Sequence, residues 1–128
     1  MGAQKNMTKA HVKANIAKPL SNEDIKELSL KEALEVIERK NTKFVWLGVE
    51  PVDVISKAIE IPENKVLAIT PEELIYYDED KLKSLKDHVF AGYHDSTSKF
   101  VLKFIKSKCG TDAFSLKGGV NSILGDIL

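Results

Sequence analysis

The chain has 128 residues, of which 43% are hydrophobic and 30% are charged, and its formal net charge is zero. This length and composition are typical of one globular domain with a single core. The balanced charge argues against a general nucleic-acid or membrane binder, and no apolar run is long enough for a membrane span or a signal peptide. Cys109 is the only cysteine, which excludes an intramolecular disulfide, so we expect a cytoplasmic protein.

Residues 1–22 differ in charge from the rest of the chain. They contain four basic residues and no acidic one, whereas all 19 acidic residues and 15 of the 19 basic residues follow. The four are Lys5, Lys9, Lys13 and Lys18. Their spacing and a weak apolar pattern are typical of a marginal helix. We therefore expect a basic arm at residues 1–22, either flexible or a short helix lying on the body, before a domain at residues 23–128.

Capping residues predict two helices in the body, and apolar spacing predicts a third. Ser29 followed by Glu32 forms a capping box before an amphipathic stretch, which predicts a helix over residues 30–40. Thr70 precedes a proline and a second capping box, so another helix begins there. Residues 78–85 are predicted to form a further helical stretch, with Leu82 and Leu85 facing inward.

Four short segments rich in β-branched and aromatic residues are predicted strands. They are Lys43–Leu47, Lys65–Ile69, Val89–Gly92 and Thr111–Leu116. Residues 52–61 predict a short helix followed by a short strand, and residues 120–128 a terminal helix. Strands that alternate with helices in this way favour an α/β domain. We expect a mostly parallel central sheet of about four or five strands, flanked by helices on both faces.

The segment from His88 to Gly110 carries the clearest functional signal. It predicts a strand, a polar loop over residues 94–98, and a long apolar helix that ends at Gly110. A helix amino terminus offers unpaired N–H groups and a positive dipole end, so it favours an anion. In parallel sheets, ligands bind beyond the carboxyl ends of the strands, where this loop falls.

The candidate ligand-binding residues lie in and after this loop. They are His94, Asp95, Ser96, Thr97, Ser98 and Lys99. Each also has a simpler role: His94 as a surface residue, Asp95 and the hydroxyls as helix caps, and Lys99 as a solvated side chain. No His or Cys lies at metal-ligand spacing, so we expect no metal and no cofactor.

The same segment resembles the active loop of rhodanese-like (sulfurtransferase) domains. In that family a strand ends in an aromatic residue followed by a cysteine. Tyr93 and His94 stand at the positions that resemble these two, and Lys99 stands at the position of the family's arginine. Residues 113–120 (AFSLKGGV) resemble the family's closing strand with Leu-x-Gly-Gly. Residues 45–51 (VWLGVEP) resemble its Asp-x-Arg-x-Pro landmark, and residues 57–62 (KAIEIP) its Gly-Ala-x-x-Ile-Pro landmark. The resemblance covers residues 28 to 124 and implies a rhodanese-like fold.

The departures from the family's pattern concern its chemistry. His94 replaces the nucleophilic cysteine, and Gly48 and Glu50 replace the aspartate and arginine of one landmark. Sulfur transfer needs a thiolate that holds a persulfide, which an imidazole does not provide. The resemblance therefore implies a non-catalytic binding or regulatory module whose partner is a small oxyanion or a protein. The alternative is a sulfurtransferase or other small enzyme that uses His94 or another thiol.

Overall fold

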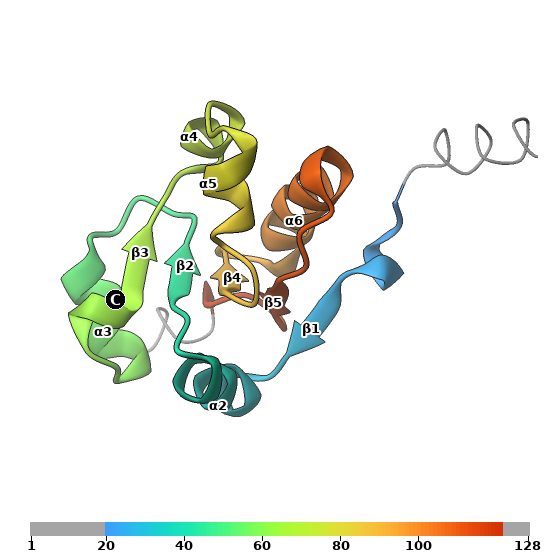
Figure 1. Ribbon diagram of the computed structural model, residues 1–128. Coiled ribbons are helices and arrows are strands. Elements are labelled where there is room, and N and C mark those ends of the chain that lie inside the picture. The colour runs from blue at the N-terminus through green and yellow to red at the C-terminus, as the bar shows by residue number, and fades with distance from the viewer. Residues whose placement is uncertain (1–19, 122–128) are drawn as a thin grey trace, which may run out of the picture.

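A five-stranded parallel sheet organises residues 20–121, the part of the chain that the computed structural model describes (Figure 1). The strands are β1 (Lys26–Leu28), β2 (Phe44–Trp46), β3 (Val66–Ala68), β4 (Val89–Ala91) and β5 (Phe114–Leu116). Their spatial order is β1-β5-β4-β2-β3, and every neighbouring pair is parallel. Strands β2 and β4 are fully buried, because helices cover both faces of the sheet.

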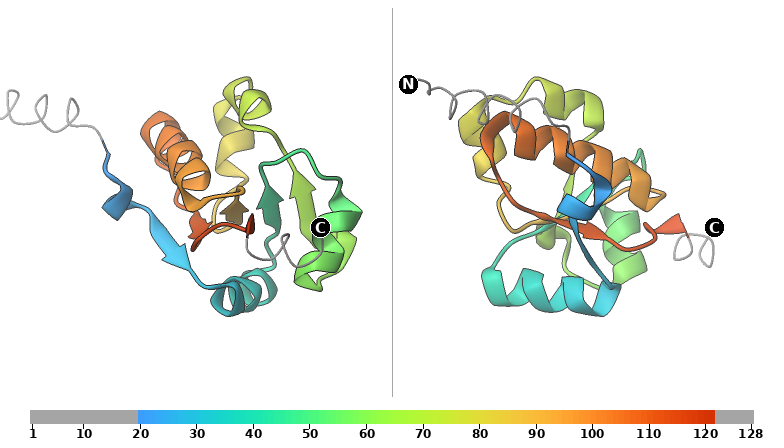
Figure 2. Two further views of the ribbon diagram at one scale, coloured as in Figure 1. Left: turned by 180° about the vertical axis from the view of Figure 1, so that it is seen from behind. Right: turned by 90° about the vertical axis from the view of Figure 1, so that its right-hand side faces the viewer.

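Helices lie on both faces of this sheet (Figure 2). They are α2 (Leu30–Lys40), α3 (Val52–Ile59), α4 (Pro71–Ile75), α5 (Glu79–Lys83) and α6 (Asp95–Cys109), and two short 3-10 turns are η1 (Asn22–Asp24) and η2 (Glu63–Lys65). Residues of α2 and α3 contact one face, and residues of α4, α5 and α6 contact the other. The predicted α/β architecture is thus confirmed. None of the helices in the described region has the length and apolar character that a membrane crossing requires.

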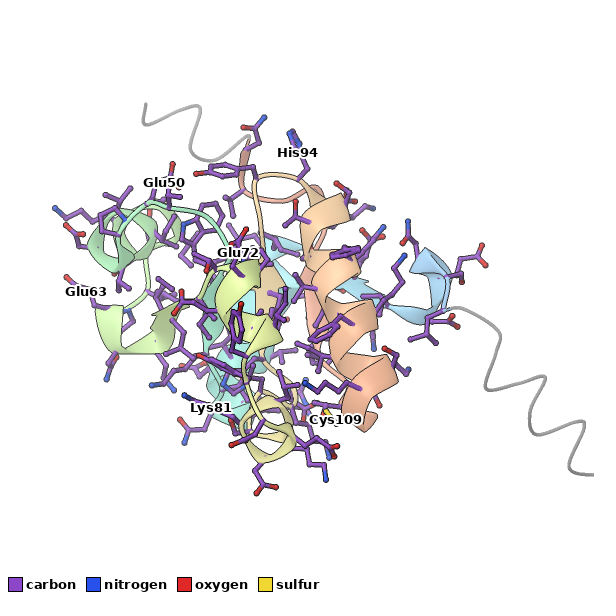
Figure 3. The ribbon with its side chains drawn as sticks, turned by 90° about the horizontal axis from the view of Figure 1, so that it is seen from above. Glu50, Glu63, Glu72, Lys81, His94 and Cys109 are labelled. Atoms are coloured by element: carbon purple, nitrogen blue, oxygen red, sulfur yellow. The ribbon has the colours of Figure 1, made fainter. Side chains whose placement is uncertain are left out.

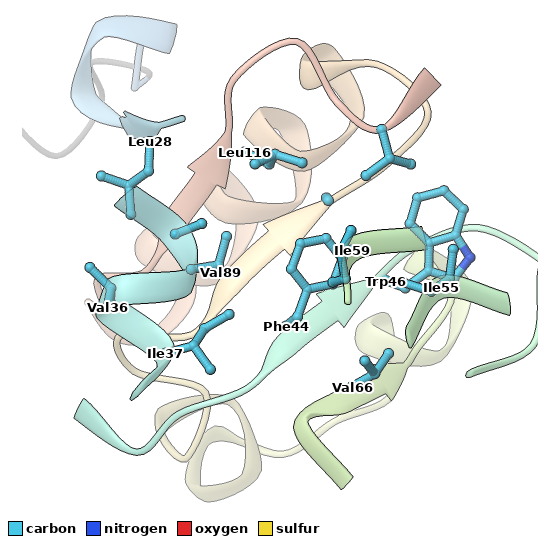
Figure 4. Packing of buried hydrophobic residues seen from close by; sticks show 13 residues of the cluster. Leu28, Val36, Ile37, Phe44, Trp46, Ile55, Ile59, Val66, Val89 and Leu116 are labelled. Atoms are coloured by element: carbon cyan, nitrogen blue, oxygen red, sulfur yellow. The ribbon is translucent and has the colours of Figure 1, made fainter. Parts of the chain in front are cut away.

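The alternation of side chains along each strand divides the core into two clusters. Phe44 and Trp46 of β2 point to the α2 and α3 face, where they pack with Ile55 and Ile59 (Figure 4). Val45, between them, points to the opposite face and joins the cluster below α4, α5 and α6.

The helix starts follow the capping residues that the sequence contains. The Ser29 hydroxyl accepts a hydrogen bond from the Glu32 N–H at 3.2 Å, and the Glu32 carboxylate accepts one from the Ser29 N–H at 2.9 Å. Thr70 and Glu73 form the same reciprocal pair at the start of α4. These capping boxes satisfy N–H groups that the first turn leaves without a helical acceptor.

Two details of the predicted elements are wrong. Strand β1 was not predicted, because only Leu28 of its three residues is apolar. The short strand predicted after α3 is absent from the described residues, because Glu60 ends α3 in the left-handed conformation (φ 60°) and the chain then enters η2. The predicted basic arm and the terminal helix lie mostly outside the described residues.

Candidate functional site

The connection between β4 and α6 is only three residues long. Gly92, Tyr93 and His94 link the two elements, and α6 begins at Asp95. His94 is the N-cap residue with extended backbone, but its side chain makes no capping hydrogen bond. The prediction of a polar loop over residues 94–98 is therefore wrong for residues 95–98, which form the first turn of α6. Only His94 lies in the connection.

The turn after β5 closes one side of this short loop. The Val120 N–H donates to the Gly92 carbonyl at 3.0 Å, and the Asn121 N–H donates to the Tyr93 carbonyl at 3.1 Å. Gly119 lies so close that a Cβ there would be 2.5 Å from the Tyr93 carbonyl oxygen. The carbonyl side of the loop is thus occupied by the chain's own backbone.

Tyr93 connects the loop to the end of β2. Its hydroxyl donates to the Glu50 carboxylate at 2.6 Å, and its ring meets the Trp46 ring edge to face, with 5.1 Å between the ring centroids. The hydrogen bond to Glu50 is the main reason that the pKa of Tyr93 is raised, because the ionised phenolate could no longer donate this bond. Glu50 is therefore a carboxylate in contact with the β4–α6 connection through Tyr93, which no local pattern in the sequence shows.

Lys99 is held by two carboxylates within the domain. Its Nζ lies 3.0 Å from Oε2 of Glu27 on β1 and 3.6 Å from Oδ2 of Asp95, one turn earlier on α6. The hydrogen bond to Glu27 is the largest cause that raises the pKa of Lys99. These ion pairs oppose the binding of an external anion by Lys99, because its charge is already neutralised by Glu27 and Asp95.

Ser98 points into the core rather than toward a ligand. Ser98 and Ser115 are both fully buried, and their Oγ atoms lie 2.5 Å apart between α6 and β5. The Ser98 hydroxyl also lies 3.0 Å from the Asp95 carbonyl oxygen. The pair fixes the first turn of α6 against the sheet.

We expect the two hydroxyls to be energetically coupled. Ser98→Ala leaves the Ser115 hydroxyl buried without its partner, which costs about 1–3 kcal/mol. The double variant Ser98→Ala/Ser115→Ala should then lose less stability than the two single losses added together. Urea unfolding of all four proteins measures this coupling, and strictly additive losses would contradict it.

The remaining predicted residues lie at the surface of the helix start. His94 and Ser96 are exposed, and Thr97 is half-buried with its side chain against Gly92. The N–H groups of Asp95 and Ser96 belong to the first turn, where a helix supplies no acceptor. The structure thus brings together at the surface an imidazole, one hydroxyl and two N–H groups, beside the Asp95 carboxylate.

The only thiol lies at the other end of the same helix. Cys109 is the last residue of α6, and Figure 3 shows it and His94 at opposite ends. Fourteen residues at 1.5 Å rise separate them by roughly 20 Å. The Cys109 sulfur is half-buried, 3.4 Å from the Ile105 carbonyl oxygen and 3.1 Å from the Thr111 hydroxyl. Among residues 20–121, no group of three or more His, Cys, Asp or Glu is placed to hold a metal ion.

Comparison with known proteins finds similarity in structure but not in sequence. No family model and no curated protein matches the sequence. Three solved protein chains match the structure. One is a rhodanese-related protein from Thermoplasma volcanium, with 17% sequence identity and a TM-score of 0.53, covering 79% of this chain and 92% of that chain. The chain therefore has a rhodanese-like fold.

Proposed function

We propose that this protein is a non-catalytic rhodanese-like module that binds a small oxyanion or a protein partner in the cytoplasm. The observation that supports this most is the position of the thiol. Cys109 lies at the carboxyl end of α6, whereas the connection that would carry chemistry precedes the amino end. A sulfurtransferase needs its thiolate at the helix amino terminus, where N–H groups stabilise the bound sulfur.

The charge around the connection supports the same proposal. Lys99, at the position of the family's arginine, is paired with Glu27 and Asp95. Asp95 adds a negative charge to the first turn, which weakens the binding of any dianion there, so we expect an oxyanion to bind only weakly. The alternative, an enzyme that uses His94 as a base, has less support. Within residues 20–121, no carboxylate is hydrogen-bonded to the His94 imidazole, so no such group orients it.

Sulfur transfer from thiosulfate to cyanide tests the proposal. We expect the wild type and Cys109→Ser to give the same rate as a reaction without protein. Turnover that disappears in Cys109→Ser would contradict the proposal. A third protein, His94→Cys, tests the loop itself: activity gained only there would show that the N–H groups still support a persulfide.

We expect weak binding of sulfate or phosphate at the start of α6. The N–H groups of Asp95 and Ser96 and the His94 imidazole supply the contacts. Phosphate titration followed by amide chemical shifts measures it, with shifts expected at Asp95 and Ser96.

Two variants separate a local site from general charge effects. His94→Gln should weaken phosphate binding, whereas His88→Gln, at the opposite end of β4, should not. Shifts elsewhere with no change at Asp95 and Ser96 would refute the oxyanion site.

A further inference from the structure

The outer face of α6 carries an exposed aromatic stripe. Phe100 is 70% exposed, and Phe104, one turn later, is only partly buried. A surface hollow of 380 Å³ lies on this stripe, lined by Leu20, Phe100, Lys103, Phe104 and Ser107. These four α6 residues recur at i, i+3, i+4 and i+7, so they share one face of the helix.

The part of the amino-terminal arm that precedes the described residues, residues 1–19, is joined to the chain at this hollow. Leu20, which directly follows residues 1–19, is one of the lining residues. Nineteen residues in a helix reach about 28 Å, whereas Phe100 and Ser107 are about 10 Å apart along α6. The arm is therefore attached where it can reach the stripe and is long enough to cross it.

The side chains of the arm suit such a contact. Met7, Ala10, Ala14 and Ala17 recur at i, i+3, i+7 and i+10, which places them on one face of a helix. Three of the four are alanines, which let a helix approach an aromatic ring closely. These four side chains share a face in the helical conformation. A helix this short is marginal by itself in water, so burial against the body would stabilise it.

Charge favours the body as the partner of the arm. The arm carries four lysines and no acid, and the rest of the chain carries four more acidic than basic residues. On α6, Lys99 and Lys106 are neutralised by ion pairs with Glu27, Asp95 and Asp112. Helix α5 lies beside α6 on the side away from η1 (Figure 3). The acidic residues in and around α4 and α5 are Glu72, Glu73, Asp78, Glu79 and Asp80.

We propose that residues 1–19 dock in cis as a short helix across the outer face of α6. The face that carries Met7 and the alanines covers Phe100 and Phe104, and the lysines point toward the acidic residues of α4 and α5.

Hydrogen–deuterium exchange of the full chain tests this docking. Amides of residues 7–17 should exchange about tenfold or more slowly than an unfolded peptide of the same sequence. Phe100→Ser should abolish this protection, whereas the control Val49→Ser, which changes an 84% exposed residue after β2, should retain it.

Three results would overturn the proposal. The first is unprotected exchange of residues 7–17 in the wild type, and the second is protection that Phe100→Ser leaves unchanged. The third is protection that rises with protein concentration together with a dimeric mass in solution, which would assign the stripe to a second copy.

Discussion

Gly119→Ala is expected to destabilise the domain by about 2–5 kcal/mol. Gly119 has a φ of +70°, where a side chain costs about 1–2 kcal/mol. Its Cβ would also lie 2.5 Å from the Tyr93 carbonyl oxygen and 2.7 Å from the His94 Cα. Both are backbone atoms, so the turn and the β4–α6 connection must move apart. Such overpacking costs about 1–3 kcal/mol more.

Gly118→Ala is the matched control. Gly118 has nearly the same backbone conformation, with a φ of +76°, but no atom lies within 4 Å of the position of its Cβ. This variant should show only the conformational cost of about 1–2 kcal/mol. Urea unfolding of both variants isolates the steric contact with the loop. Equal losses in the two would show that the turn does not close the loop.

Trp46→Ala is the second change with a large expected effect, about 3–5 kcal/mol. The Trp46 side chain is fully buried in β2, and its ring fills the space beside Gly48 so closely that a Cβ there would meet it at 2.2 Å. Its removal leaves a cavity between the sheet and α3 and takes away the ring that positions Tyr93.

Trp46→Phe should cost much less than Trp46→Ala. Within the described residues the Trp46 indole N–H has no hydrogen-bond acceptor, so phenylalanine loses packing but no hydrogen bond. Far-ultraviolet circular dichroism during urea unfolding measures both, since the chain has no other tryptophan to report fluorescence. A loss in Trp46→Phe as large as that in Trp46→Ala would indicate that the indole N–H makes an essential contact.

The elements that the sequence predicted well are those with local signals. The capping boxes at Ser29 and Thr70 act over three residues, and the apolar strands β2 and β4 are buried on both faces. Caps and apolar runs are set by residues that are close together in the sequence, so they can be recognised from the sequence alone. Strand β1 has no such signal, because its place at the sheet edge leaves Lys26 exposed and Glu27 half-exposed.

The candidate site depends on contacts between distant segments, which no local pattern shows. Tyr93 and Glu50 are 43 positions apart, and Lys99 meets Glu27 only because β1 pairs with β5. The hydroxyl-rich run after His94 predicted a loop because serine and threonine favour turns and caps. In the structure, residues 95–98 are the first turn of α6, and the Ser98 hydroxyl forms a hydrogen bond with Ser115 inside the core.

Intact-mass spectrometry after incubation with thiosulfate tests the proposed absence of sulfur transfer most directly. A rhodanese-type reaction leaves one extra sulfur atom on the reactive thiol as a persulfide. Because Cys109 is half-buried at the far end of α6, we expect the wild type to keep its unmodified mass, as Cys109→Ser does. A gain of one sulfur in the wild type, absent from Cys109→Ser and removed by cyanide, would contradict the account.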